Sequence, residues 1–74
     1  MVAVDFHYTD GTNTLFEHIT SIEFQTSERM VKLQGADMLT SFINTRHAIT
    51  LRSECAVHQV NTDNLRHLSV TKEN

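Results

Sequence analysis

The chain has no proline and no tryptophan, and it has one cysteine and two glycines in 74 residues. A single cysteine cannot form an intrachain disulfide, so no internal cross-link stabilises the fold. Two glycines argue against the glycine-rich loops that hold nucleotide phosphates, and no P-loop, G-x-G-x-x-G, G-x-S-x-G or H-E-x-x-H motif occurs. These absences disfavour the common phosphate-binding and hydrolytic chemistries.

Positive charge is also sparse. Six Lys+Arg against nine Asp+Glu give a formal charge of −3. Nucleic-acid binding draws much of its affinity from clustered cations that release counterions from phosphates. The basic residues here are scattered, so nucleic acid is not the expected partner, and a small Sm-like or OB-like barrel that binds it is kept as an alternative. They are Arg29, Lys32, Arg46, Arg52, Arg66 and Lys72.

No apolar run approaches the ~18 residues of a membrane span, and no basic–apolar–small pattern marks a signal peptide. Together with the lone thiol, this predicts a cytoplasmic protein without membrane contact, with a subunit of a structural particle as the alternative. A chain of 74 residues forms one domain and buries roughly 60–65% of its unfolded surface. Domains of this size often need a metal or a partner chain for stability.

The strongest local pattern is a β-hairpin at the start of the chain. Residues 2–8 (VAVDFHY) alternate apolar and polar, which is typical of a half-buried strand. Asp10-Gly11 follows and favours a two-residue hairpin turn. A turn centred on that pair places Phe6 opposite Leu15, Val4 opposite Glu17 and Val2 opposite Ile19.

The remaining sequence predicts further short strands in a small antiparallel meander, curled sheet or small barrel. Residues 21–25 and 29–35 form a hairpin closed by 26–29, followed by strands at 48–53 and 56–60. Residues 65–70 give one turn and a short strand, and 71–74 form a frayed tail.

Residues 36–45 (ADMLTSFINT) leave two alternatives open. On a helical wheel Ala36, Met38, Leu39, Phe42 and Ile43 fall in one arc, which predicts a short helix and an α+β fold. The threonine and asparagine content favours a strand instead.

One constellation has the spacing of a metal site. Cys55-x-x-His58 matches half of a zinc motif, and His47 and His67 could supply the other two ligands. In an extended segment, however, Cys55 and His58 have opposite parity and point to opposite faces. We therefore predict no metal and no cofactor, and we keep a zinc-stabilised module as an alternative.

Catalysis is not expected either. Cys55 and His58, with Asp63 to orient the imidazole, are the only nucleophile–base candidates, and one small sheet offers little room for a substrate pocket. His7 and His18 share a strand face but lie roughly 13 Å apart in the predicted register. An enzymatic function would need a composite pocket between subunits.

The absence of proline, with only two lysines, has a further consequence. Proline and lysine are the usual devices that keep sheet edges from pairing with other chains. Several unprotected strands predict a non-enzymatic interaction or assembly module. Its partner would be a second copy or another protein, held through a sheet edge or an apolar face.

Overall fold

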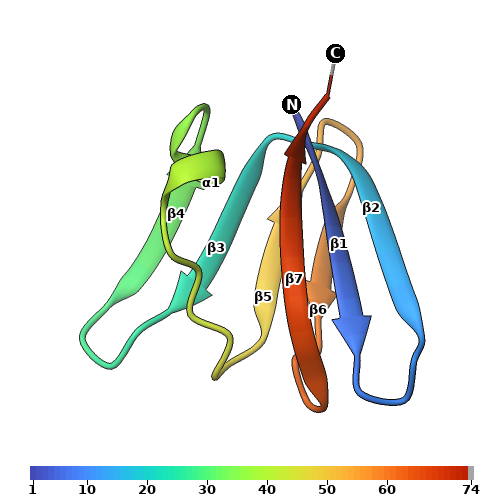
Figure 1. Ribbon diagram of the computed structural model, residues 1–74. Coiled ribbons are helices and arrows are strands. Elements are labelled where there is room, and N and C mark those ends of the chain that lie inside the picture. The colour runs from blue at the N-terminus through green and yellow to red at the C-terminus, as the bar shows by residue number, and fades with distance from the viewer. Residues whose placement is uncertain (74) are drawn as a thin grey trace.

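The computed structural model describes residues 1–73 and shows two antiparallel sheets with one short helix (Figure 1). The first sheet has the strand order β2-β1-β7 and the second the order β4-β3-β5-β6. The prediction of a small, mainly β domain is confirmed, and over residues 1–73 the sheets do not close into a barrel. The elements are β1 (Val2–Tyr8), β2 (Asn13–Ile19), β3 (Ser21–Gln25), β4 (Met30–Gln34), α1 (Asp37–Thr40), β5 (Ile49–Arg52), β6 (Val57–Val60) and β7 (Leu65–Lys72).

The hydrophobic core is formed by the alternate residues that the period-2 pattern of the strands turns inward. Val4 and Phe6 of β1 and Leu51 of β5 are at most 1% exposed. Burial of these side chains is the main force that holds the two sheets together. The other buried hydrophobic residues are Val2, Ile19, Ile22, Phe24, Leu33, Met38, Ile43, Ile49 and Val60.

The Asp10-Gly11 sequence does form the turn of the first hairpin, but the loop is one residue longer than predicted. The Gly11 N–H donates to the Tyr8 carbonyl at 3.1 Å, and the Tyr8 N–H donates to the Thr12 carbonyl at 2.9 Å. Gly11 has a φ of +91°, as expected for the left-handed residue of a three-residue hairpin loop. The Thr12 hydroxyl and the Thr12 N–H both donate hydrogen bonds to the Asp10 carboxylate and lower its pKa, and the hydroxyl has the larger effect.

The longer loop shifts the register of β2 by one residue. Phe6 pairs with Thr14 and Val4 pairs with Phe16, so the predicted partners Leu15 and Glu17 are wrong. A shift of one residue exchanges the two faces of a strand. Phe16 therefore turns inward and packs edge-on against Phe6 at a ring-centroid distance of 5.7 Å, whereas Leu15 is 53% exposed.

A β-bulge in β2 reverses this shift before the strand ends. His18 has a φ of +60°, and Val2 pairs with Ile19 as predicted. An extra residue in one strand restores the original parity, so Ile19 returns to the core and is fully buried. The bulge also interrupts the free edge of β2.

Replacing Gly11 by alanine should lower the free energy of unfolding by about 1 kcal/mol, because an alanine at positive φ is strained. No atom lies within 4 Å of the position that the new Cβ would take, so the loss comes from the backbone alone. Urea denaturation measures this difference. Gly11→Asn should lose less, since asparagine tolerates this conformation, and an equal loss in both variants would contradict the assignment.

The chain passes from the first sheet to the second at Thr20, without a hairpin. The Thr20 N–H and hydroxyl both donate to the Arg52 carbonyl, at 2.8 and 3.1 Å. Consequently β2 and β3 do not pair, and β3 lies between β4 and β5. The predicted meander is wrong at this corner, because β5 satisfies the backbone of Thr20. The predicted hairpin of β3 and β4 is confirmed, with Phe24 opposite Val31.

Residues 36–45 form a single helical turn followed by irregular chain. Helix α1 ends at Thr40, and Ser41 is extended with ψ of 148°. Met38 and Ile43 are buried as the helical arc predicted, but Phe42 is 86% exposed. The prediction of one buried arc fails for Ala36, Leu39 and Phe42, which are all exposed. Phe42 lies beyond the helix, which ends at Thr40. The alternative strand is not formed.

The C-terminal segment is the longest strand, where the sequence predicted one turn and a short strand. Thr71 and Lys72 of the predicted frayed tail belong to β7 and pair with Ala3 and Val2. The N–H of Glu73 then donates to the Met1 carbonyl at 3.2 Å. Pairing with the edge of β1 thus holds this segment as a strand. Residue 74 of the predicted tail lies outside the described part of the chain.

Candidate functional site

Strand β7 forms the longest sheet edge in the structure. Over residues 1–73 its only neighbour in the sheet is β1, so the other edge presents backbone N–H and carbonyl groups without a strand partner. Its charged residues, Arg66 and Lys72, lie near the two ends and leave the middle of the strand uncharged. Edge strands are usually protected by charge, proline or a bulge, and the centre of β7 has none of these.

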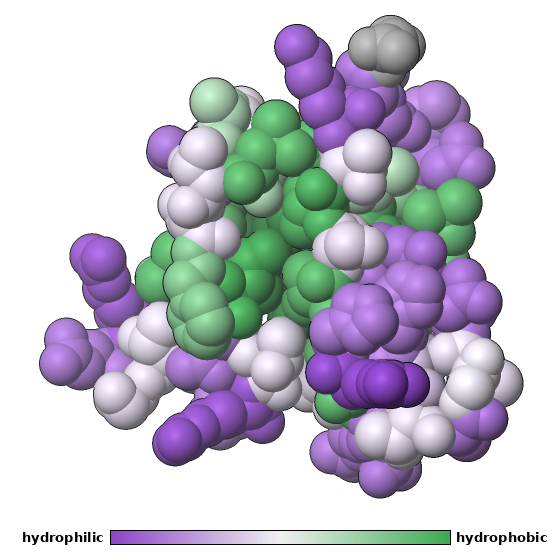
Figure 2. All heavy atoms as spheres, viewed as in Figure 1, coloured by the Kyte–Doolittle hydropathy of each residue, from purple (hydrophilic) through white to green (hydrophobic). Residues whose placement is uncertain are grey.

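An apolar groove runs beside this edge, between β7 and the segment that follows α1. We call it the β7 groove; it encloses about 370 Å3. Figure 2 shows the hydrophobic surface that gathers between the α1 region and β7. The residues that line it are Met38, Leu39, Ser41, Phe42, Ile43, Thr45, Leu68 and Val70.

The exposure of Phe42 is the unusual feature of this groove. Phe42 is 86% exposed and Leu39 is 43% exposed, whereas Ile43, which lines the same groove, is buried. The backbone is extended at Ser41, where the helical turn has ended, and of the next two residues Phe42 is exposed and Ile43 is buried. A free strand edge next to an apolar groove can add an extended chain by backbone pairing, with side chains held in the groove.

The four residues considered as zinc ligands have separate surroundings. Cys55 is exposed in the turn between β5 and β6, and His58 tilts against Phe16 at a ring-centroid distance of 4.9 Å. His47 is exposed and accepts a hydrogen bond at its carbonyl from Thr62, and His67 stacks on His7 at 4.4 Å. Among the described residues they do not belong to any group of three candidate ligands within 4.8 Å of one another.

Asp63, the residue considered as a catalytic orienter, donates its N–H to the Asn61 side chain at 2.8 Å. This hydrogen bond lies in the turn before β7, and among residues 1–73 no side-chain hydrogen bond or ion pair joins Asp63 to Cys55 or His58. The thiol, imidazole and carboxylate therefore lack the chain of hydrogen bonds that activates a nucleophile.

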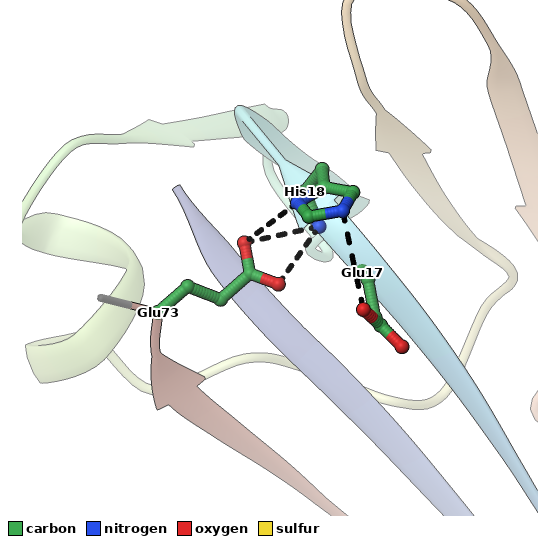
Figure 3. Close-up of side chains that lie close together, drawn as sticks. All are labelled: Glu17, His18 and Glu73. Carbon is green, nitrogen blue, oxygen red and sulfur yellow. Dashed lines mark hydrogen bonds and ion pairs between the residues drawn. The ribbon is translucent and has the colours of Figure 1, made fainter.

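His7 and His18 are each held by different partners. His7 Nε2 lies 3.1 Å from Asp5 Oδ2 on the outer face of the first sheet, and its ring stacks on His67. His18 instead contacts Glu73 and Glu17 at the opposite end of β2 (Figure 3). The sequence predicted that the two histidines lie too far apart to act together, and their separate partners agree with this.

The cluster of Glu17, His18 and Glu73 is the feature that the sequence did not predict. His18 Nδ1 lies 3.3 Å from Glu73 Oε1, and the His18 N–H donates to the Glu73 carboxylate at 3.1 and 3.2 Å. Glu17 Oε2 approaches His18 Nε2 at 3.9 Å. Glu73 is 55 residues from His18 in the sequence, so only the pairing of β7 with β1 brings them together.

Comparison with family models, with curated proteins and with solved structures gives no match to this chain. Among the described residues, no helix has the length and apolar character needed to cross a membrane.

Proposed function

We propose that the protein is a non-enzymatic assembly module that self-associates through the β7 edge and the β7 groove. The observation that carries this proposal is the open eight-residue edge beside the exposed Phe42. Backbone pairing would supply affinity, and the side chains of the added strand would supply specificity.

The surface of the isolated chain supports a partner that covers part of it. Among residues 1–73, six large hydrophobic residues are exposed, and two of them, Leu39 and Phe42, line the β7 groove. Neighbouring exposed hydrophobic residues mark interaction surfaces more often than isolated ones do.

A second copy is the partner that best fits this geometry. Two β7 strands related by a two-fold axis can pair antiparallel, because the same edge is free in each copy. Both unprotected edges are then satisfied in one contact, and each groove lies next to the other copy.

Sedimentation velocity over a concentration series tests this proposal. The unmodified chain should sediment above the mass of one chain of 8.5 kDa at high concentration. Phe42→Asp should raise the dissociation constant by at least roughly tenfold, since an aromatic anchor at an interface typically contributes more than about 1.4 kcal/mol. Phe42 is exposed in the isolated chain, so this change should leave the fold intact.

Two further variants separate the β7 edge from general surface effects. Ser69→Lys places a charge in the middle of β7, and Ser69 is paired with Asp5 of β1. This variant should weaken association, because a lysine on an edge strand hinders pairing with another chain, and it should remain folded. Val57→Asp changes a side chain that is 54% exposed in β6 and should leave association unchanged. A chain that stays monomeric at every concentration would contradict the proposal, as would equal effects of Phe42→Asp and Val57→Asp.

A further inference from the structure

We propose that Glu17, His18 and Glu73 form a binding site for a zinc-type divalent metal ion, at the end of the first sheet (Figure 3). One candidate ligand atom from each of these side chains lies within 4.8 Å of the other two. The set combines one imidazole with two carboxylates, and zinc sites use both kinds of donor. This proposal is independent of the β7 groove.

The spacing of the two nearest donors fits a shared ion. His18 Nδ1 and Glu73 Oε1 are 3.3 Å apart. Two ligands of a tetrahedral zinc ion, each about 2.1 Å from the metal, lie about 3.4 Å from each other. An ion could therefore be held between these two atoms without movement of the backbone.

Glu17 requires a side-chain rotation to become the third ligand. Its carboxylate lies near Nε2, on the opposite side of the ring from Nδ1, and one imidazole offers one nitrogen to a given ion. The Glu17 side chain is 58% exposed, so neighbouring groups leave it room to rotate. Consecutive residues of a regular strand point to opposite faces, which would keep Glu17 away from His18. The bulge at His18 breaks this alternation and allows both side chains to approach one ion.

The charge at this end of the sheet favours a cation. In the part of the chain that the structure describes, the ion-pair contacts of Glu17 and Glu73 are with His18 alone. The two carboxylates have no lysine or arginine ion-pair partner among the described residues, and a divalent ion would balance their charge. Imidazole as a ligand favours zinc and its neighbours over calcium or magnesium, which prefer oxygen ligands alone.

A hollow beside the cluster gives access to the ion. It has a volume of about 280 Å3 and is lined by Met1, Glu17 and His18, and also by Ser53, Glu54 and Cys55, which follow β5. Zinc sites with three protein ligands keep the fourth position for water or a further donor. Cys55 thus lines the hollow beside the proposed ion, but the proposed ligands do not include Cys55, His47, His58 or His67.

A bound ion would cross-link the fold. Glu73 follows β7 and His18 lies in β2, and these two strands occupy opposite edges of β1. The metal would tie both edges of the sheet together in a chain that has no disulfide. Binding to the folded state alone raises stability by mass action, so the melting temperature should rise with metal concentration.

Isothermal titration calorimetry of ZnCl2 into the full chain, pretreated with chelator, tests the site. We expect one zinc ion per chain and an increase in melting temperature. His18→Asn removes the imidazole but suits the left-handed backbone at this position, so the variant should fold. Its affinity for zinc should fall by more than about tenfold, since even groups that only orient metal ligands cost about 10- to 100-fold when lost. Glu73→Gln should weaken binding in the same way.

His67→Ala is the matched control, because it also removes one imidazole from the first sheet, and His67 stacks on His7 away from the proposed ligands. This variant should bind zinc as the unmodified chain does. Absence of binding by the unmodified chain would overturn the proposal. Unchanged affinity in a His18→Asn variant with native circular dichroism would also overturn it, as would an equal loss in His67→Ala.

Discussion

Replacing Phe6 by aspartate is expected to leave the chain unfolded at 25 °C. Phe6 is fully buried between the two sheets. Loss of a buried phenylalanine side chain typically costs 3–5 kcal/mol, roughly, and a buried carboxylate without a partner adds several more. Folded domains have about 0.05–0.15 kcal/mol of stability per residue, so a chain of 74 residues has about 4–11 kcal/mol in total. The expected loss is as large as this total.

Circular dichroism and thermal denaturation measure the outcome. The Phe6→Asp variant should lose the β-sheet spectrum and show no cooperative transition. Leu15→Asp puts the same group on the neighbouring strand at a position that is 53% exposed, and its stability should change by at most about 0.5 kcal/mol. A folded Phe6→Asp variant would show that Phe6 does not lie in the core.

The second large effect should distinguish the two faces of β2. Phe16→Ala is expected to lower the free energy of unfolding by about 2 kcal/mol, because Phe16 packs against Phe6 and His58 and is partly buried. Leu15→Ala should change it by less than about 0.5 kcal/mol. A two-residue turn at Asp10-Gly11 would pair Leu15 with Phe6 and predict the opposite order.

Urea denaturation of both variants measures the loss in the free energy of unfolding for each. The same dependence of this free energy on urea concentration is used for both variants. A larger loss for Leu15→Ala would restore the register that the sequence predicted. The pair is well matched, because the residues are adjacent, apolar and in the same strand, and differ chiefly in the face that they occupy.

Local patterns predicted most of the strands correctly because their causes are local. Alternation of Val2, Val4 and Phe6 fixes which face of β1 is buried, whatever lies opposite. The hairpin of β3 and β4 likewise depends on residues that are close in sequence. The register of β2 could not be predicted from these local patterns. The sequence predicted a two-residue turn, but the loop has three residues and shifts the pairing by one residue. The later bulge at His18 shifts the pairing back by one residue.

The candidate sites depended more strongly on contacts between distant residues. The sequence suggested an open sheet edge, from the absence of proline and the scarcity of lysine, but not which strand would provide it. The β7 groove also requires α1 to end at Thr40, which leaves Phe42 exposed. The group of Glu17, His18 and Glu73 has no signature in the sequence, because Glu17 and His18 are adjacent but Glu73 joins them only through the pairing of β1 with β7.

The sequence by itself determined a small β-rich chain without disulfides, with a charge of −3 and with alternating faces on its strands. These properties follow from residue types and from the two-residue period of a strand. Tertiary structure alone decided the order β2-β1-β7, the corner at Thr20 and the ordering of Thr71–Glu73. Each depends on a backbone edge from a distant part of the chain, and hydrogen bonding to that edge outweighs the weak local preference of the segment.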